Sequence, residues 1–228
     1  MAQDKQENVE KGIHNIESAL GRTEQFIEDN RNPIMYAVGA IALLIAIFFG
    51  VKHFVISPKE KEAESAIFMA QRYFEEDSFR LALDGDGANI GFIELINSYG
   101  ITKTANLARY YAGISLLKTG EYEEAIKYLK KFHGNDKLVA PIAHGALGDA
   151  NLELGNDKEA ISDYLKAAKM SENAFTSPIF LMKAAQVYEK INDYAGALKV
   201  YERVKKDFPN STEGNQIDKY IERAKLKM

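Results

Sequence analysis

The sequence contains no cysteine, and its 228 residues include only four histidines. The lack of cysteine excludes disulfide bonds, thiolate catalysis and all cysteine-ligated zinc or iron–sulfur sites, but it does not report the redox compartment. No histidine pairs with a second one four residues away around a glutamate, so no helix-borne zinc site is expected at His14, His53, His133 or His144. We interpret His144 as a packing or surface residue, and we expect no metal and no cofactor.

An excess of positive charge is also missing, because 29 basic residues stand against 33 acidic ones, a net charge of −4. Nucleic acid is therefore not an expected partner. The run DGDG at 84–87 lacks the oxygen ligand that a calcium loop needs at Ala88. The sequence shows no phosphate-binding loop and no nucleophile elbow, and we expect a protein that is not an enzyme. With 46% hydrophobic residues the chain can build a core, which excludes disorder along its whole length.

The apolar residues are concentrated in the run PIMYAVGAIALLIAIFFGV, from Pro33 to Val51. As a helix, these 19 residues span about 28 Å, close to the hydrocarbon thickness of a bilayer. We predict a single transmembrane helix over 33–56, begun by Asn32-Pro33 and stopped by Ser57-Pro58. A cleaved signal peptide is not expected, because the 32 residues before the run hold seven acids and four bases.

Small residues recur on one face of this predicted helix, at Ala42, Ala46 and Gly50. That spacing allows close approach of another transmembrane helix, although alanine and glycine are frequent in such helices anyway. The basic residues that flank the helix are nearly balanced, with Arg22 and Arg31 before it and Lys52, Lys59 and Lys61 after it. Flanking charge therefore does not settle the topology.

The N-terminal tail, 1–32, has the pattern of an amphipathic helix. Its apolar face would carry Ile13, Ile16, Leu20 and Phe26 or Ile27. Such a helix could dock on a partner, lie on the membrane surface or be solvated.

The region after the anchor repeats with a period of about 35 residues. Small residues stand twelve apart in the pairs Gly113 and Ala125, Gly148 and Ala160, and Ala185 and Ala197. We predict helical hairpins in which the two small residues of a pair meet where the helices cross. Seven positions after the first member stands Gly120, Gly155 or Asn192, residues that tolerate the left-handed conformation at a helix end.

This pattern resembles the tetratricopeptide repeat (TPR), in segments such as YAGISLLKTGEYEEAIKYLKKF and HGALGDANLELGNDKEAISDYLKAA. Together with the apolar run, the resemblance predicts an all-α fold, a single transmembrane helix followed by a TPR α-solenoid. The predicted parts of the solenoid are a degenerate first unit with an insertion over 57–103, three units over 104–211 and a capping helix over 212–228.

In TPR arrays the first helices of the hairpins line a groove that binds partners. The residues that the resemblance places there are Ile67, Gln71, Phe74, Tyr110, Ile114, Leu117, Asp149, Leu152, Gln186 and Glu189. The first half of this set is apolar and aromatic, which suits unfolded or apolar polypeptide segments. The alternative is that the insertion at 84–100 covers these side chains.

The layout also resembles the ancillary subunit of the bacterial Sec translocon, through the junction EQFIEDNRNPIMYAVGAIALLIAIFFG and the order of tail, anchor and TPR region. This resemblance implies a single-pass inner-membrane protein with a cytoplasmic N-terminus and a periplasmic TPR region. Its implied partners are the translocon and a membrane-anchored prolyl isomerase chaperone, and its role is that of a chaperone-like accessory factor in protein transport. The alternative function is a structural factor that clamps a cell-envelope or outer-membrane assembly complex.

Overall fold

A computed structural model describes residues 28–228, and every regular element in this range is a helix. The all-α expectation is thus confirmed for these residues. They include one isolated antiparallel β-bridge, between Gly85 and Ile90. The chain divides into two compact units, one ending at Ser57 and one running from Pro58 to Met228. The predicted amphipathic face at 13–27 lies outside the described residues.

The first unit contains α2 (Arg31–Val51) and the π-helical turn η1 (Lys52–Ile56). At about 1.5 Å per residue α2 is about 32 Å long, and none of its side chains is buried by the rest of the chain. It is long and apolar enough to cross a membrane. The predicted stop at Ser57-Pro58 is wrong, because the helix does not end there and continues from η1 directly into α3, which begins at Ser57. The amide of Ser57 bonds to the Lys52 carbonyl in π-helical fashion just before the proline, whose ring needs extra room in a helix.

The second unit opens with an irregular hairpin. Its elements are α3 (Ser57–Glu75), α4 (Phe79–Asp84) and α5 (Phe92–Tyr99). The loop between α4 and α5 turns on Asp86, whose carboxylate accepts hydrogen bonds from the Tyr73 hydroxyl at 2.6 Å and from the Asn89 amide at 2.6 Å. These bonds lower the pKa of Asp86, the tyrosine contributing most. The loop thus brings α5 back onto the core, where Phe92 is fully buried.

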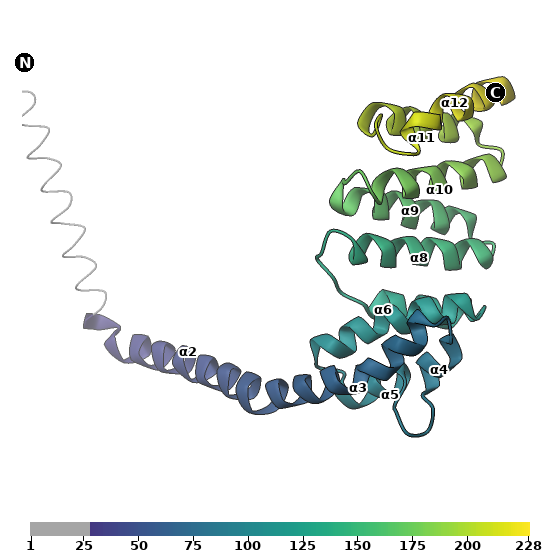
Figure 1. Cartoon of the computed structure of the whole chain (residues 1–228). Helices are drawn as coiled ribbons and strands as arrows, with labels where there is room; N and C mark the ends of the chain where they lie inside the picture. The colour runs from purple at the N-terminus through teal and green to yellow at the C-terminus, as the bar shows by residue number, and fades with distance from the viewer. Residues whose placement is uncertain (1–27) are drawn as a thin grey trace, which may run out of the picture. The chain divides into compact units, whose positions relative to one another are not determined.

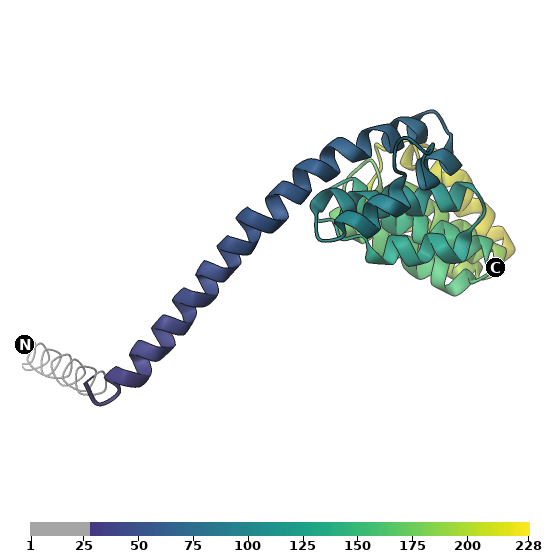
Figure 2. The same ribbon diagram turned by 90° about the horizontal axis from the view of Figure 1, so that it is seen from below.

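Three regular hairpins and a final helix follow, and Figures 1 and 2 show them stacked one upon another. The elements are α6 (Lys103–Lys118), α7 (Tyr122–Lys131), α8 (Val139–Glu153), α9 (Asp157–Ser171), α10 (Ser177–Lys190), α11 (Tyr194–Asp207), η2 (Gly214–Gln216) and α12 (Ile217–Lys227). The face of α12 that carries Ile217, Ile221 and Ala224 is buried on the last hairpin. Its other face is exposed, as a terminal repeat element requires.

The hairpin turns have the left-handed residue that the sequence pattern predicts. The φ angle is +85° at Gly120, +76° at Gly155 and +62° at Asn192. The amide of each of these residues and the amide after it bond back to carbonyl groups in the last turn of the first helix, which is the Schellman arrangement. Asp77, with φ of +54°, does the same in the irregular first hairpin. The expectation for the three regular turns is confirmed.

In the first two regular hairpins, the atoms nearest to the glycine of the first helix belong to a large residue of the second helix. A side chain at Gly113 would meet Leu129 at 2.5 Å, and one at Gly148 would meet the ring of Tyr164 at 2.6 Å. The nearest atoms therefore do not belong to the predicted partners Ala125 and Ala160, which are buried four residues earlier. Because the helices cross at an angle, a large residue of the second helix fills the space that each glycine leaves.

Candidate protein-binding groove

One face of each first helix in the later hairpins stays open. On α10 the half-buried and exposed positions Ile179, Lys183, Gln186 and Lys190 follow at steps of four, three and four residues, so they form one stripe. The opposite face of the helix is buried, with Leu181 completely covered. Because one face of α10 is buried against the neighbouring helices, the stripe on its opposite face is exposed to solvent.

Two adjoining clefts lie along this stripe. The first has a volume of about 260 Å³ and lies between α8 and α10. The second, of about 300 Å³, lies between α10 and α12. Both clefts include Lys183 and Gln186, and Tyr220 of α12 closes the second. We call the two clefts together the α10 groove.

The floor of the first cleft is polar. Lys183 Nζ lies 2.6 Å from Asp149 Oδ1 and 2.9 Å from Oδ2, and the Tyr164 hydroxyl donates to Asp149 Oδ1 at 2.5 Å. Lys183 Nζ also stands 5.5 Å from the centroid of the Tyr164 ring. Burial, followed by the hydrogen bond to Asp149, raises the pKa of Tyr164, so this hydroxyl remains a donor at neutral pH.

Further ion pairs lie close to the groove. Lys190 Nζ lies 2.5 Å from Asp157 Oδ1, and Arg223 Nη2 lies 2.6 Å from Glu189 Oε2. The second pair joins α10 to α12. The pKa of the nearby Tyr201 is raised to about 12, mainly by burial and then by Glu189. These contacts are made within the chain and need no partner to form.

The residues that the sequence pattern assigns to a groove fall into different environments. Asp149, Leu152 and Gln186 line the first cleft of the α10 groove. Glu189 instead faces Arg223. The three groove candidates of α6 pack half-buried against the cluster that includes Leu129 and Leu147; these candidates are Tyr110, Ile114 and Leu117.

The candidates on α3 lie in and beside the first core cluster. Ile67 is buried, and Phe74 packs edge-on against Phe79, Phe92 and Tyr111. Gln71 lies in a surface depression beside the exposed Phe68. On α2 the small residues occupy exposed or half-exposed positions; these are Ala42, Ala46 and Gly50.

Several residues of the α10 groove do not figure in the sequence-based set, among them Lys183 and Tyr164. The signal for Lys183 is its position, four residues after Ile179 and three before Gln186 on the same helical face. Tyr164 carries no such signal, because it belongs to a second helix, where a large residue is expected to be core.

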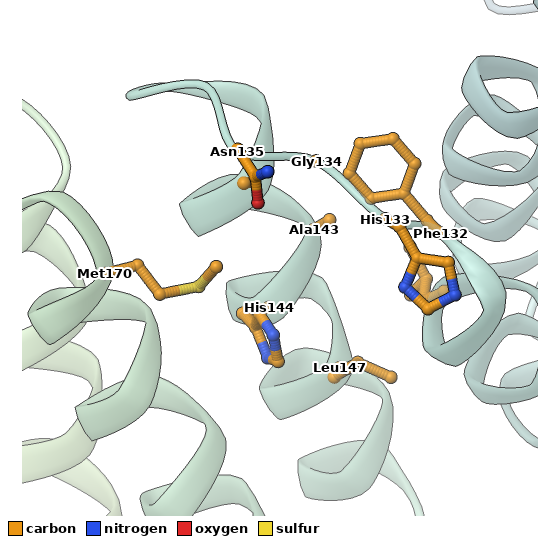
Figure 3. Close-up of a pocket in the computed structure, with 10 residues that line it drawn as sticks. Phe132, His133, Gly134, Asn135, Ala143, His144, Leu147 and Met170 are labelled. Atoms are coloured by element: carbon orange, nitrogen blue, oxygen red, sulfur yellow. The ribbon is translucent and has the colours of Figure 1, made fainter. Parts of the chain in front are cut away.

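A separate hollow of about 150 Å³ lies where the loop after α7 passes over α8. Figure 3 shows His144 in its centre, with Met170 on one side and Phe132 and His133 on the other. The Nδ1 atom of His144 is buried, and none of residues 28–228 makes a hydrogen bond to it. Burial and then Lys166 lower the pKa of His144, so its ring is neutral at pH 7.

Comparison with known proteins identifies the repeats. Residues 110–175 and 180–211 each match a family profile of the tetratricopeptide repeat. The chain is also similar to a TPR repeat-containing protein of Methanocaldococcus jannaschii, with 30% identity over 101 residues. That stretch covers 44% of this chain and 17% of the archaeal protein. The chain thus contains TPR repeats, and the first cleft of the α10 groove is lined by residues of the matched ranges, whereas the second extends beyond them to α12.

TPR arrays mediate protein–protein interactions and are typically scaffolds that do not catalyse reactions. The groove agrees with that general role, because it offers aliphatic surface together with a few fixed polar groups. Within residues 28–228 no group of three or more histidine or acidic side chains is arranged to hold a metal ion.

Proposed function

We propose that this protein is a membrane-anchored scaffold whose α10 groove binds segments of other proteins, and that it serves as a periplasmic accessory factor of the Sec translocon. The observation that carries the first part is the pair of adjoining clefts that share Lys183 and Gln186. An extended segment or a partner helix could lie along both clefts, with its apolar side chains toward Leu152 and Ile179.

The anchor in this proposal is α2 with η1. Its large apolar side chains, such as Leu44 and Phe48, are 67% and 63% exposed, and lipid would cover them in a bilayer. In this topology the tail is cytoplasmic and the TPR unit is periplasmic. The support for that orientation is the resemblance of the tail-to-anchor junction and of the overall layout to the translocon subunit.

The topology is tested by cysteine labelling, since the natural chain has no cysteine to interfere. We would introduce Ser18→Cys in the tail and Glu123→Cys at an exposed site of α7. A membrane-impermeant maleimide added to spheroplasts is expected to label residue 123 and to reach residue 18 only after lysis. The reverse result, or labelling of both sites before lysis, would contradict the proposed orientation.

The partner is tested by photo-crosslinking from the groove. A photoreactive amino acid at Gln186 is expected to capture translocon components, the prolyl isomerase chaperone and secreted proteins in transit. The matched control position is Glu202, an exposed residue of α11. A single stoichiometric complex of the cell envelope captured at Gln186 would favour the assembly-factor alternative, and equal capture from both positions would argue against the groove.

A further inference from the structure

The loops that lead into α6, α8 and α10 lie on one side of the second unit, together with the start of α3 (Figure 1). Glu60, in the first turn of α3, accepts hydrogen bonds from the Lys103 amide at 2.8 Å and from the Thr104 amide at 2.9 Å. The Thr104 hydroxyl donates to Glu60 at 2.7 Å as well. The chain therefore enters this unit beside the N-terminus of α6. We call this side, with loops 100–102, 132–138 and 172–176, the loop edge.

Hydrogen bonds join the successive loops along this side. The Asn106 side chain donates to the His133 carbonyl at 2.7 Å and accepts from the His133 amide at 3.0 Å. The Lys137 carbonyl accepts from the Ser171 hydroxyl at 3.0 Å and from the Asn173 amide group at 3.1 Å. The loop edge is thus a continuous, ordered surface from the start of α3 to the start of α10.

A large apolar side chain is exposed in each loop, with 59% exposure at Ile101, 51% at Leu138 and 79% at Phe175. The backbone around the last two is fixed by similar caps. Asp136 accepts from the Leu138 amide at 2.9 Å, and Asn173 accepts from the Phe175 amide at 2.8 Å. These side chains are therefore presented outward by an ordered backbone, in three successive repeats.

The two sides of the unit differ in charge, although the start of α3 adds the exposed acids Glu62 and Glu64 to the loop edge. Exposed lysines at or next to the loop edge are Lys103, Lys130, Lys131, Lys137 and Lys169. The side with the hairpin turns, which we call the turn edge, carries more acids than bases; its acids include Glu76, Glu121, Glu124, Glu153 and Asp157, and its lysines are Lys118, Lys158 and Lys190. In the three loops of the loop edge the acids are Asp136, which caps α8, and Glu172, which lies 3.6 Å from Arg203.

We propose that the loop edge lies on the surface of an anionic lipid bilayer, with Ile101, Leu138 and Phe175 in the interface. This rests on the proposed function, because α2 must span that bilayer. A chain that leaves the membrane just before Pro58 holds the loop edge near the lipid. Lysines are attracted to anionic headgroups over about a Debye length, and exposed apolar side chains gain by entering the interface. The acidic turn edge would then face away from the lipid.

The experiment uses the full chain reconstituted in nanodiscs, with a fluorophore on Ala174→Cys beside Phe175. Nitroxide-labelled lipids are expected to quench this fluorophore strongly in discs containing phosphatidylglycerol and weakly in discs of phosphatidylcholine alone. The comparison site is Glu123→Cys, near the turn edge, which we expect to be quenched in neither. Equal quenching at both sites, or none at residue 174 in anionic discs, would overturn the proposal.

Two sets of variants separate the apolar and charged contributions. Leu138→Ser with Phe175→Ser is expected to abolish quenching at residue 174. Each of the reversals Lys103→Glu and Lys137→Glu should lower the ratio of docked to free TPR unit by at least about fivefold in anionic discs, because about 1 kcal/mol is lost with the lysine alone. Phe68→Ser is the matched control, because it removes a side chain of 63% exposure in the second half of α3. A helical signal unchanged in circular dichroism confirms that each variant is folded.

The failure of this proposal differs from the failure of the anchor. A chain that does not migrate with the discs contradicts the membrane anchor, and the docking proposal then falls with it. A chain that migrates with the discs, but whose residue 174 is not quenched, contradicts docking alone. Quenching that ignores headgroup charge, or that survives the Leu138 and Phe175 substitutions, also overturns the docking proposal.

Discussion

Lys183 of α10 and Asp149 of α8 are joined by an ion pair of 2.6 Å, which links the first helices of two neighbouring hairpins across the floor of the α10 groove. Both side chains are about one-third exposed. Solvent screens such a pair, so its contribution to stability is small. Under the proposed function, we expect this pair to matter more for binding in the groove than for folding.

Lys183 and Tyr164 both donate hydrogen bonds to Asp149, and we expect their substitutions to differ in their effect on the free energy of unfolding. Lys183→Met should change the free energy of unfolding by less than about 1 kcal/mol, because the ion pair is exposed. Tyr164→Phe should cost about 1 kcal/mol, because Tyr164 is 1% exposed and its hydroxyl donates to Asp149. Urea unfolding followed by circular dichroism measures both values. A larger loss for Lys183→Met than for Tyr164→Phe would contradict this account of the floor.

The same lysine substitution should affect binding. If a partner segment lies in the groove, Lys183→Met should reduce photo-crosslinking from Gln186, since Lys183 lines both clefts. Lys199→Met is the control, an exposed lysine of α11. Equal crosslinking in the two variants would show that Lys183 does not contact the partner.

The next prediction concerns the close contact between Gly148 and Tyr164. In an open helix, replacing glycine by alanine stabilises by up to about 1 kcal/mol. Here the new methyl group would lie 2.6 Å from the tyrosine ring, so Gly148→Ala should instead destabilise by about 1–3 kcal/mol. Thermal and urea unfolding both report the sign. Stabilisation would mean that the ring has room to move.

The repeat period and the hairpin turns could be predicted from the sequence because each has a local cause. A residue that tolerates positive φ must follow each first helix, and Gly120, Gly155 and Asn192 show this directly. The side chains that lie against the glycines could not be predicted in the same way. The spacing of small residues does not show which large side chain of the second helix lies nearest to Gly113 or Gly148, and these are Leu129 and Tyr164.

The groove could be predicted only in part for a related reason. Asp149, Leu152 and Gln186 lie on the exposed stripes of first helices, which periodicity reveals. Tyr164 reaches Asp149 because Gly148 has no side chain and the ring can lie against α8. That contact depends on three-dimensional packing between two helices. The contact between the rings of Phe92 in α5 and Phe74 likewise depends on the insertion, because its helix has no counterpart in the regular units.

The left-handed turn residues give a further prediction. Asn192, with φ of +62°, pays a strain that glycine does not have, so Asn192→Gly should stabilise the chain by up to about 1 kcal/mol. At the equivalent turn, Gly155→Ala should destabilise by about 1 kcal/mol, although its Cβ would meet no atom within 4 Å. Because space is not limiting at Gly155, a neutral result there would refute the conformational explanation.

The last prediction is a pH dependence that originates at Glu60. Burial alone would raise the pKa of this carboxyl, but the Thr104 hydroxyl and the amides of Lys103 and Thr104 together lower it. A carboxyl whose pKa is lower in the folded state stabilises the fold above its unfolded pKa, about 4.3. This contribution is lost as the pH falls through the folded pKa.

Glu60→Gln should therefore lower the urea midpoint at pH 7, and the difference from the natural protein should shrink toward pH 3. Glu64→Gln, at an exposed position of the same helix, should show no such pH-dependent difference. A Glu60→Gln deficit that stays constant from pH 7 to pH 3 would show that the ionised carboxylate is not what holds α3 to the start of α6.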